Sequence, residues 1–572
     1  MWINKIHSFL ISPLTKTSRS RLIFWLVLSL AMGGIYGILS LQQAFNQPNL
    51  VQDDARQHVF WMLRFIDPDL FPNDLIANYF QSVAPAGYTT VYRIAAFLGI
   101  NPLVFCRIIP VILTLISTVY FFCFCLELLP IPFTGFVGSL ILNQVMWLKD
   151  DLASGTPRAF IYPIFTAFLY YLARKSILGV GITIGLIGLF YPQYIFVAAG
   201  MLILRIIYKR SWINLKISFL GLIITFIIIL FYALKTSEFG PAITRAEAMQ
   251  SLEFFPNGRS MFFHAEPLDF WLTGRRSGMF PKSIFTPVTQ CLGLLFPVLM
   301  YFRSIFPMAN QVTTKVWILF QLLISSITMF FLAHALLFKL HLPSRYTGLS
   351  LRLIMATITA IAITIVIDYL LTELESQKFD QFNSFKFLKS GLSFGLTSVI
   401  LASLLLYPSW VPFFPLVEYK EGEAVEIYTF FQQQPKDIMI ASLSGEVNQI
   451  PTFAQRSILV GREYMIPYQV GYYRQMNQRL VDLMQAHYSP SLEDLKTFIQ
   501  TYGVDFFLME RYALTPEYFE NNDWILEFEA GQQALQQLKT GTIPQLATTI
   551  DQCSAFENPA WIILDARCMV NL

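Results

Sequence analysis

Two pairs of adjacent aspartates are the residues in this sequence best suited to chemistry. Asp53 and Asp54 lie shortly after the first long apolar run, and Asp150 and Asp151 follow a later one. Neighbouring carboxylates can share a proton, so that one becomes a general base, or they can hold a divalent cation. We therefore predict catalytic acids at Asp53 and Asp54 and a second acidic pair at Asp150 and Asp151, with a metal as an option at all four.

Each pair also has a purely structural interpretation. Asp54 is a suitable N-cap for a helix that begins at Ala55. Asp151 could be a solvated loop acid. The chemical interpretation gains weight because both pairs follow apolar runs and are expected on the same face of a membrane.

Arginines near the ends of other apolar runs could bind an anion. A guanidinium offers a fork of N–H groups that matches phosphate oxygens. The alternative is an anchor whose charged head reaches the membrane interface from a helix end. The predicted phosphate-binding residues are Arg158, Arg275, Arg276, Arg345 and Tyr346.

The histidines and cysteines do not have the spacing of a metal site. His58 and His341 are isolated, and His334 lies within an apolar run, where a hydrogen-bonded bundle residue is expected. Cys553 and Cys568 are the only cysteines in the polar tail. Because we expect that tail in an oxidising compartment, we predict a disulfide between them.

The elements that would position these residues are membrane helices. Hydrophobic residues make up 55% of the chain and charged residues 13%, against about 25% charged in a soluble domain. Apolar runs of about 20 residues predict a mainly α, polytopic helix bundle over 1–410, with about eleven spans and outer loops at 44–102 and 235–283. The expected spans are 22–43, 103–126, 133–148, 158–173, 177–191, 193–208, 213–234, 284–302, 315–338, 351–371 and 391–410. A net charge of +3 gives no indication of nucleic-acid binding.

The distribution of basic residues predicts the orientation. Lys5, Lys16, Arg19 and Arg21 precede the first span, which places the N-terminus in the cytoplasm. The inner loops then contain Arg174, Lys175, Lys209, Arg210, Lys216, Arg303, Lys378, Lys386 and Lys389, and the tail lies outside. No N-x-Ser/Thr sequon occurs, which favours a bacterial inner membrane.

Two extramembrane regions have readable patterns. Residues 55–66 show apolar side chains at helical spacing, which predicts an amphipathic helix on the membrane surface. The tail, 415–572, alternates strand-like and helix-like segments and is predicted to be an extracytoplasmic α/β domain. Strands are expected at 438–443, 457–460, 505–509 and 561–564, and helices at 475–487, 492–502 and 532–539.

This layout resembles the GT-C superfamily of membrane glycosyltransferases. Asp53–Asp54 stands where protein mannosyltransferases, and the aminoarabinose transferase that is similar to them, have their loop acids. Asp150–Asp151 stands near the second-loop acidic motif of oligosaccharyltransferases. The tail lacks Trp-Trp-Asp, the motif of oligosaccharyltransferases. The resemblance implies a donor sugar on a polyprenyl phosphate or diphosphate.

On this basis we expect a glycosyltransferase that moves a sugar from a polyprenyl-phosphate donor to a lipid, glycan or protein acceptor at the outer face. Asp53 or Asp54 would be the base, and the arginines would stabilise the leaving phosphate. Membrane lipid is an expected partner, and most members of the resembled family need no metal. The alternatives are a transporter or flippase of lipid-linked sugars and a non-catalytic membrane scaffold.

Overall fold

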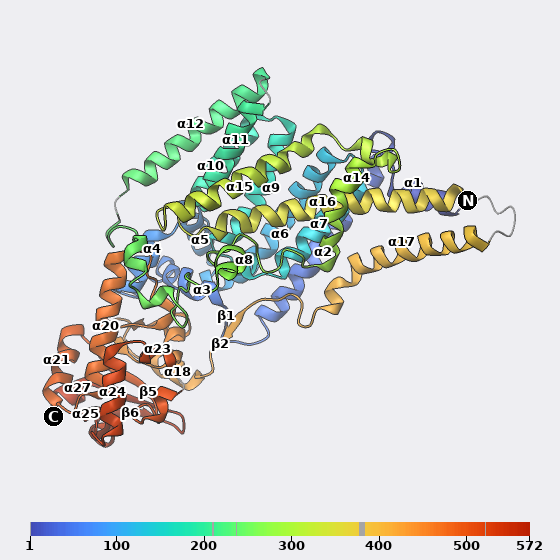
Figure 1. Ribbon diagram of the computed structural model, residues 1–572. Coiled ribbons are helices and arrows are strands. Elements are labelled where there is room, and N and C mark those ends of the chain that lie inside the picture. The colour runs from blue at the N-terminus through green and yellow to red at the C-terminus, as the bar shows by residue number, and fades with distance from the viewer. Residues whose placement is uncertain (1, 209–210, 236, 377–383, 521) are drawn as a thin grey trace.

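The computed structural model describes residues 2–208, 211–235, 237–376, 384–520 and 522–572 and consists of a helix bundle joined to an α/β domain (Figure 1). Every predicted span contains helix. The bundle helices are α2 (Arg19–Ala44), α6 (Pro102–Leu128), α7 (Pro132–Trp147), α9 (Pro157–Arg174), α10 (Ile177–Phe190), α11 (Ile195–Tyr208), α12 (Trp212–Leu234), α14 (Phe296–Tyr301), α15 (Trp317–Ala335), α16 (Ser344–Ser376) and α17 (Ser384–Trp410).

Six helices in the described residues are long and apolar enough to cross a membrane: Arg19–Ala44, Pro102–Leu128, Trp212–Leu234, Thr314–Ala335, Ser344–Glu375 and Leu388–Trp410. Other predicted spans form shorter helices, such as α10 with 14 residues, below the about 20 residues that match bilayer hydrocarbon. The chain is therefore a multi-pass membrane protein, while the number of about eleven spans remains a prediction.

The bundle is apolar on its outside as well as in its core. All 16 residues of α7 are buried, so this helix lies at the centre. On the peripheral helix α12, Phe219, Phe226 and Phe231 are each more than half exposed. Exposed aromatic rings on an outer face are expected where lipid rather than water surrounds the protein.

The segment 44–102, predicted as the first outer loop, folds into helices that are buried rather than laid on the membrane. It contains α3 (Asp53–His58), a 3₁₀ segment (Phe60–Phe65), α4 (Leu75–Val83) and α5 (Ala86–Phe97). Val59, Met62 and Leu63 are all buried. The surface helix predicted at 55–66 is thus wrong, because all of its apolar side chains except Ile66 are buried or half-buried, and Phe60 contacts Tyr464 of the tail.

The tail contains a five-stranded sheet with the strand order β4-β3-β5-β7-β6. Strands β3 (Met439–Ala441), β4 (Ser457–Ile458) and β5 (Phe506–Glu510) are parallel, and β7 (Trp561–Asp565) pairs antiparallel with β5 and with β6 (Ser554–Glu557). The predicted α/β domain is therefore confirmed. Its helices are α18 (Val425–Gln432), α19 (Ile450–Phe453), α20 (Val470–Tyr488), α21 (Leu492–Tyr502), α22 (Glu517–Glu520), α23 (Asp523–Leu526), α24 (Glu529–Lys539), α25 (Gln545–Thr548), α26 (Ile550–Cys553) and α27 (Ala566–Val570).

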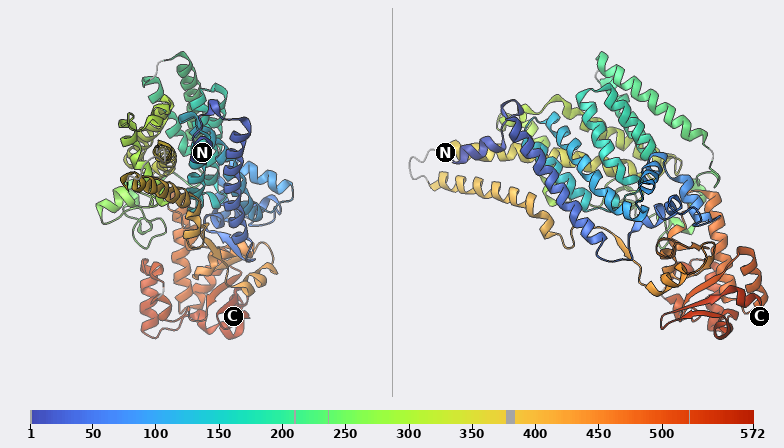
Figure 2. Two further views of the ribbon diagram at one scale, coloured as in Figure 1. Left: turned by 90° about the vertical axis from the view of Figure 1, so that its right-hand side faces the viewer. Right: turned by 180° about the vertical axis from the view of Figure 1, so that it is seen from behind.

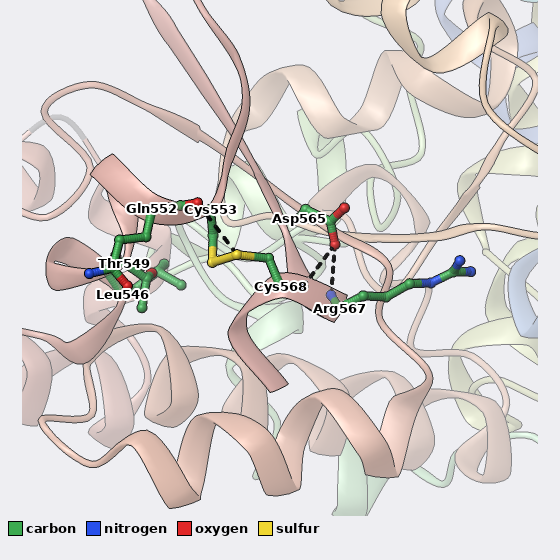
Figure 3. The surroundings of a disulfide bond; sticks show 7 residues. All are labelled: Leu546, Thr549, Gln552, Cys553, Asp565, Arg567 and Cys568. Carbon is green, nitrogen blue, oxygen red and sulfur yellow. Dashed lines mark hydrogen bonds between the residues drawn. A yellow bond between two sulfur atoms is a disulfide. The ribbon is translucent and has the colours of Figure 1, made fainter. Parts of the chain in front are cut away.

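A disulfide joins Cys553 and Cys568, with the two Cα atoms 5.5 Å apart (Figure 3). It ties α26 to α27, the last helix of the tail. The predicted disulfide is thus confirmed. The β6–β7 hairpin lies between its two cysteines in the sequence.

The N-terminus and the tail lie at opposite ends of the bundle in Figure 1 and in the right view of Figure 2. The amino-terminal helix α1 (Trp2–Leu10) contacts the far end of α16, where His7 pairs with Asp368 at 2.9 Å and with Glu375 at 3.0 Å. Opposite ends are what an odd number of spans requires. Of the predicted inner-loop basic residues, Lys209, Arg210 and Lys378 lie outside the described residues.

Candidate active site

A cavity of about 620 Å³ lies where the bundle meets the tail. Both predicted acidic pairs line it, as do three of the predicted arginines. Its acids are Asp53, Asp54, Asp150, Asp151 and Glu418, and its basic residues are Lys149, Arg158, Arg275, Lys282, Arg345 and Arg352. Segments that are far apart in the sequence therefore bring five acids and six cations to one place.

A two-stranded sheet holds the first acidic pair against the start of the tail. Strand β1 (Leu50–Gln52) pairs antiparallel with β2 (Tyr419–Glu421). Directly after β1, the backbone N–H of Asp53 donates to the carbonyl of Glu418 at 3.0 Å. The backbone N–H of Glu418 in turn donates to Oδ1 of Asp150 at 2.9 Å. One residue of the tail thus links the two acidic pairs.

Gln52, and not Asp54, is the N-cap of helix α3. Its side-chain oxygen accepts from the backbone N–H of Ala55 at 3.1 Å. The helix begins at Asp53, two residues earlier than predicted, so both aspartates lie in its first turn, where the positive end of the helix dipole favours their charge. The carboxylate of Asp54 is therefore not used for capping.

The second acidic pair is positioned by a tight turn between α8 (Asp150–Ala153) and α9. Gly155 has a φ of +61°, and a Cβ there would lie 2.7 Å from the carbonyl oxygen of Cys106. The hydroxyl of Tyr92 donates to the Gly155 carbonyl at 2.8 Å. This turn fixes the start of α9, so that Arg158 reaches back to Asp151.

Arg158 bridges the two pairs. Its guanidinium donates to Oδ2 of Asp54 and, at 2.8 Å, to Oδ1 of Asp151. Arg352 donates to the other Asp151 oxygen at 2.8 Å and to the hydroxyl of Tyr162 at 3.0 Å. Asp53 is held separately, by Arg56 of the same helix.

The surroundings shift the pKa values of the second pair in opposite directions. Burial, with a further contribution from the Glu418 charge, raises the pKa of Asp150 to about 7. Burial would also raise the pKa of Asp151, but the charges of Arg352 and Arg345 outweigh it and lower that pKa. Asp150 therefore titrates near neutral pH while Asp151 stays ionised.

Four basic residues of the cavity are not neutralised by ion pairs. Within the described part of the chain, no carboxylate pairs with the side chains of Lys149, Arg275, Lys282 or Arg345. Arg345 lies in the first turn of α16, Lys149 directly precedes α8, and Arg275 and Lys282 belong to the loop before α14. Unpaired cations beside a cavity wall are available to bind an anion.

Two of the predicted phosphate-binding residues lie outside this cavity. The guanidinium of Arg276 donates to the backbone carbonyls of Arg259 and Met261, at 3.3 and 3.5 Å. The hydroxyl of Tyr346 is directed to the Leu340 carbonyl at 2.6 Å, and its ring is fully buried. Neither side chain lines the cavity, because each donates to backbone carbonyls nearby.

The histidines do not join the cavity either. His334 bonds to the Ser277 carbonyl at 2.9 Å, as expected of a satisfied bundle residue. The ring of His58 packs against Phe80 and that of His341 against Tyr468. Burial lowers the pKa values of His58 and His341 to about 4 and about 3, which keeps both neutral.

No protein-family model and no curated protein matches the sequence. Among solved structures, the chain is similar to the oligosaccharyltransferase of Archaeoglobus fulgidus in the apo form, with 11% identity and a TM-score of 0.49 over 89% of this chain and 72% of that one. The structure of the Archaeoglobus fulgidus enzyme AglB in complex with an inhibitory peptide and a dolichol-phosphate matches with 10% identity, a TM-score of 0.49, and coverage of 88% and 72%. At 10–11% identity, this similarity concerns the fold of the backbone alone.

The acids do not form a metal-binding set. In the described residues, no three side chains of His, Cys, Asp or Glu are grouped as a metal would require. Where a cation could bridge Asp54 and Asp151, the guanidinium of Arg158 already does so. The residues present therefore do not fit the metal that the sequence left as an option.

Sequence reasoning missed Arg352, Glu418, Lys149 and Lys282 as cavity residues. A signal for Arg352 was present, because it follows Arg345 by seven residues and so shares its helix face, and because a charge inside an apolar span is a functional suspect. Glu418 carried no such signal, since its contribution is a backbone contact across the sheet of β1 and β2.

Proposed function

We propose that this protein is a membrane glycosyltransferase that moves a sugar from a polyprenyl-phosphate-linked donor to a lipid, glycan or protein acceptor at the outer face. The observation that carries the proposal is the cavity where acids from two loops meet unpaired cations next to apolar helices. The phosphate of a lipid-linked donor would bind to those cations, and its lipid chain would lie against the apolar helices. Sugar transfer also requires a carboxylate beside the phosphate.

The donor phosphate binds to Arg275, Arg345 and Lys282. These side chains have no carboxylate partner within the described residues, so their N–H groups are free to contact phosphate oxygens. Exposed apolar side chains stand close by in sequence, with Phe280 41% and Phe285 45% exposed. They give the polyprenyl chain an apolar route from the cavity into the bilayer.

Asp54 acts as the general base. Its Oδ2 accepts from Arg158, and its Oδ1 has no hydrogen-bond donor among the described residues, so that Oδ1 is available to the acceptor. The acceptor oxygen attacks the anomeric carbon, its proton passes to Asp54, and the bond between that carbon and the phosphate oxygen breaks. The phosphate leaves with the electron pair, and Arg275 and Arg345 stabilise its growing charge.

The two alternatives predict different sites. A transporter of lipid-linked sugars is expected to place its binding groups near the middle of the membrane, between repeated halves. Here the charged residues of the cavity come in part from the turn after β1 and from α8. Figure 1 shows β1 where the bundle meets the tail. A scaffold would not require two acidic pairs and unpaired arginines around one cavity.

The test is transfer by purified protein in lipid nanodiscs supplied with a synthetic polyprenyl-phosphate sugar and an acceptor extract of the host membrane. We expect free polyprenyl phosphate to appear together with sugar-labelled acceptor, and only when the protein is present. An intact donor would contradict the proposal. Movement of that intact donor between the leaflets of proteoliposomes would establish the transporter instead.

A further inference from the structure

The guanidinium of Arg158 occupies the position where a divalent cation would bridge the acids of the cavity. It contacts one carboxylate from each outer loop, Asp54 of α3 and Asp151 of α8. Bridging carboxylates of separate loops is a task that bound divalent cations often perform. The positive charge between Asp54 and Asp151 is thus the side chain of Arg158.

The oxygens that a metal would need are already engaged. Of the four carboxylate oxygens of Asp54 and Asp151, three accept hydrogen bonds from guanidinium groups: Oδ2 of Asp54 and Oδ1 of Asp151 from Arg158, and Oδ2 of Asp151 from Arg352. The Asp53 carboxylate pairs with Arg56, and Oδ1 of Asp150 accepts from the backbone N–H of Glu418. A divalent ion of the Mg²⁺ or Ca²⁺ kind takes six or more oxygen ligands and would have to displace these donors.

The charge around the cavity also opposes a metal. Six Lys and Arg side chains line it against five Asp and Glu. A divalent ion would lie next to the guanidinium groups of Arg158 and Arg352, which already pair with the aspartates that would be its ligands. The repulsion between the ion and these two positive groups is strong in a partly buried site.

The position of Arg158 is built into the backbone. It lies in the first turn of α9, directly after the turn in which Gly155 fits under the Cys106 carbonyl. Its side chain is 20% exposed, and those of Asp54 and Asp151 are each 22% exposed. A side chain that is held in this way supplies a permanent positive charge without recruitment of an ion.

We infer that Arg158 replaces a divalent metal in this site, so that the protein aligns its two acidic loops and performs its reaction without a metal ion. The inference rests on the proposed function, and it identifies Arg158 as a bridging cation rather than as one of the phosphate-binding arginines. Arg275 and Arg345 are left for the donor.

Mn²⁺ is a suitable probe, because carboxylate and water oxygens bind it and its paramagnetic resonance reports binding without any assay of activity. The full-length protein in detergent is titrated with Mn²⁺, and transfer is measured with and without EDTA. We expect no specific Mn²⁺ site and the same transfer rate in both conditions. A stoichiometric Mn²⁺ site that disappears in Asp54→Asn, or transfer that stops in EDTA and returns with Mn²⁺, would overturn the inference.

The variant Arg158→Ala frees both acids. We expect it to gain a Mn²⁺ site and to lose transfer by about 10²- to 10³-fold, the usual effect of removing one preorganised charged donor. Arg345→Ala is the matched control, since it removes a cavity cation that pairs with neither acid, and it should gain no Mn²⁺ site. Arg158→Lys keeps a cation and should also exclude Mn²⁺; Mn²⁺ binding by Arg158→Lys or by the parent protein would count against the inference.

These measurements separate the two proposals. If untreated protein shows no transfer at all, the proposed function fails, while the Mn²⁺ titration still decides whether Arg158 excludes a metal. If transfer occurs and depends on added metal, the proposed function stands and the role of Arg158 is wrong.

Discussion

At the scale of single residues, the cavity contains two kinds of arginine. Arg158 and Arg352 are neutralised by aspartates, and Arg275 and Arg345 are not paired with acids within the described residues. Paired arginines position the acids. Unpaired arginines remain available to a ligand, which is why we assign them to the donor phosphate.

Arg345→Ala should weaken binding of polyprenyl phosphate while the protein stays folded. Loss of one charge-assisted contact costs about 1.5 to 3 kcal/mol, or roughly 10- to 100-fold in affinity. Arg345→Lys should restore only part of this, because a lysine has no fork of N–H groups. The measurement is lipid binding by native mass spectrometry, with Arg303→Ala as control, since Arg303 is exposed and lies outside the cavity. Equal binding by parent and Arg345→Ala would reduce Arg345 to an interfacial anchor.

The raised pKa of Asp150 predicts a dependence of stability on pH. An unfolded aspartate titrates near pH 4, whereas burial raises the pKa of Asp150 to about 7. Between these values the native protein binds more protons than the unfolded chain, so the contribution of Asp150 to stability falls as pH rises. Asn at this position stays neutral and can still accept from the Glu418 N–H.

Asp150→Asn should therefore gain stability relative to the parent between pH 5 and pH 8. Melting temperatures of both proteins at the two pH values test this. Glu446, whose pKa burial also raises to about 7, is present in both proteins, so its effect cancels in the comparison. A difference in melting temperature that does not change with pH would show that Asp150 is already ionised at pH 5.

At the scale of elements, one glutamate of the tail contacts two of the loops of the bundle. Glu463, in the 3₁₀ turn Arg462–Tyr464, accepts from Arg259 of the 235–283 loop and from Gln57 of α3. It also lies 3.4 Å from the guanidinium of Arg56, the partner of Asp53. The tail thereby contributes to the placement of the loop that contains Asp53 and Asp54.

Glu463→Gln should destabilise the protein by about 1 to 3 kcal/mol, because Arg56 and Arg259 then lose a buried negative partner. A drop in melting temperature and faster hydrogen exchange over 50–60 are the expected signs. Glu557→Gln is the matched control. Glu557 pairs with Arg511, the two side chains are 38% and 43% exposed, and this pair should contribute little to stability. If both variants behave alike, Glu463 does not couple the tail to the loop.

The sequence predicted the elements of this protein better than their contacts. Apolar runs and alternating patterns located the bundle helices and four of the strands, because each pattern repeats over many residues. The sequences of strands β1 (Leu-Val-Gln) and β2 (Tyr-Lys-Glu) form no apolar run like those around β3 and β4, and their pairing joins segments more than 360 residues apart. The surface helix at 55–66 was mispredicted because its apolar face looks the same whether lipid or protein covers it.

All four predicted aspartates line the cavity, but only three of the four predicted arginines do. Paired aspartates and Arg158, Arg275 and Arg345 were visible as charges at the ends of apolar runs. The sequence could not show that Arg276 turns to backbone carbonyls, nor that Arg158 pairs with Asp54, 104 positions away. Both depend on how the outer loops fold over the bundle.

At the scale of the whole molecule, the fold separates the N-terminus from the tail by the length of the bundle (Figure 2). Combined with the basic residues of the N-terminal segment, this predicts a cytoplasmic N-terminus and an outer tail. A cysteine introduced on the exposed face of α21, Glu493→Cys, should react with an impermeant maleimide in intact cells. A cysteine at Lys16→Cys should react only after permeabilisation, in a background with Cys291→Ser. The reverse labelling would contradict the topology and place the cavity on the cytoplasmic side.

The central claim is that the cavity transfers sugar with Asp54 as the base, and the most direct test is the transfer rate of Asp54→Asn under saturating donor. Asparagine keeps the shape of the side chain and can still accept a hydrogen bond from Arg158, but it cannot take up the proton. We predict a fall of about 10² to 10⁴ in rate, with donor binding and melting temperature near those of the parent. Asp69→Asn, in the same loop with a side chain 82% exposed and outside the cavity, should transfer at the parent rate. Normal transfer by Asp54→Asn and by Asp53→Asn would contradict the claim.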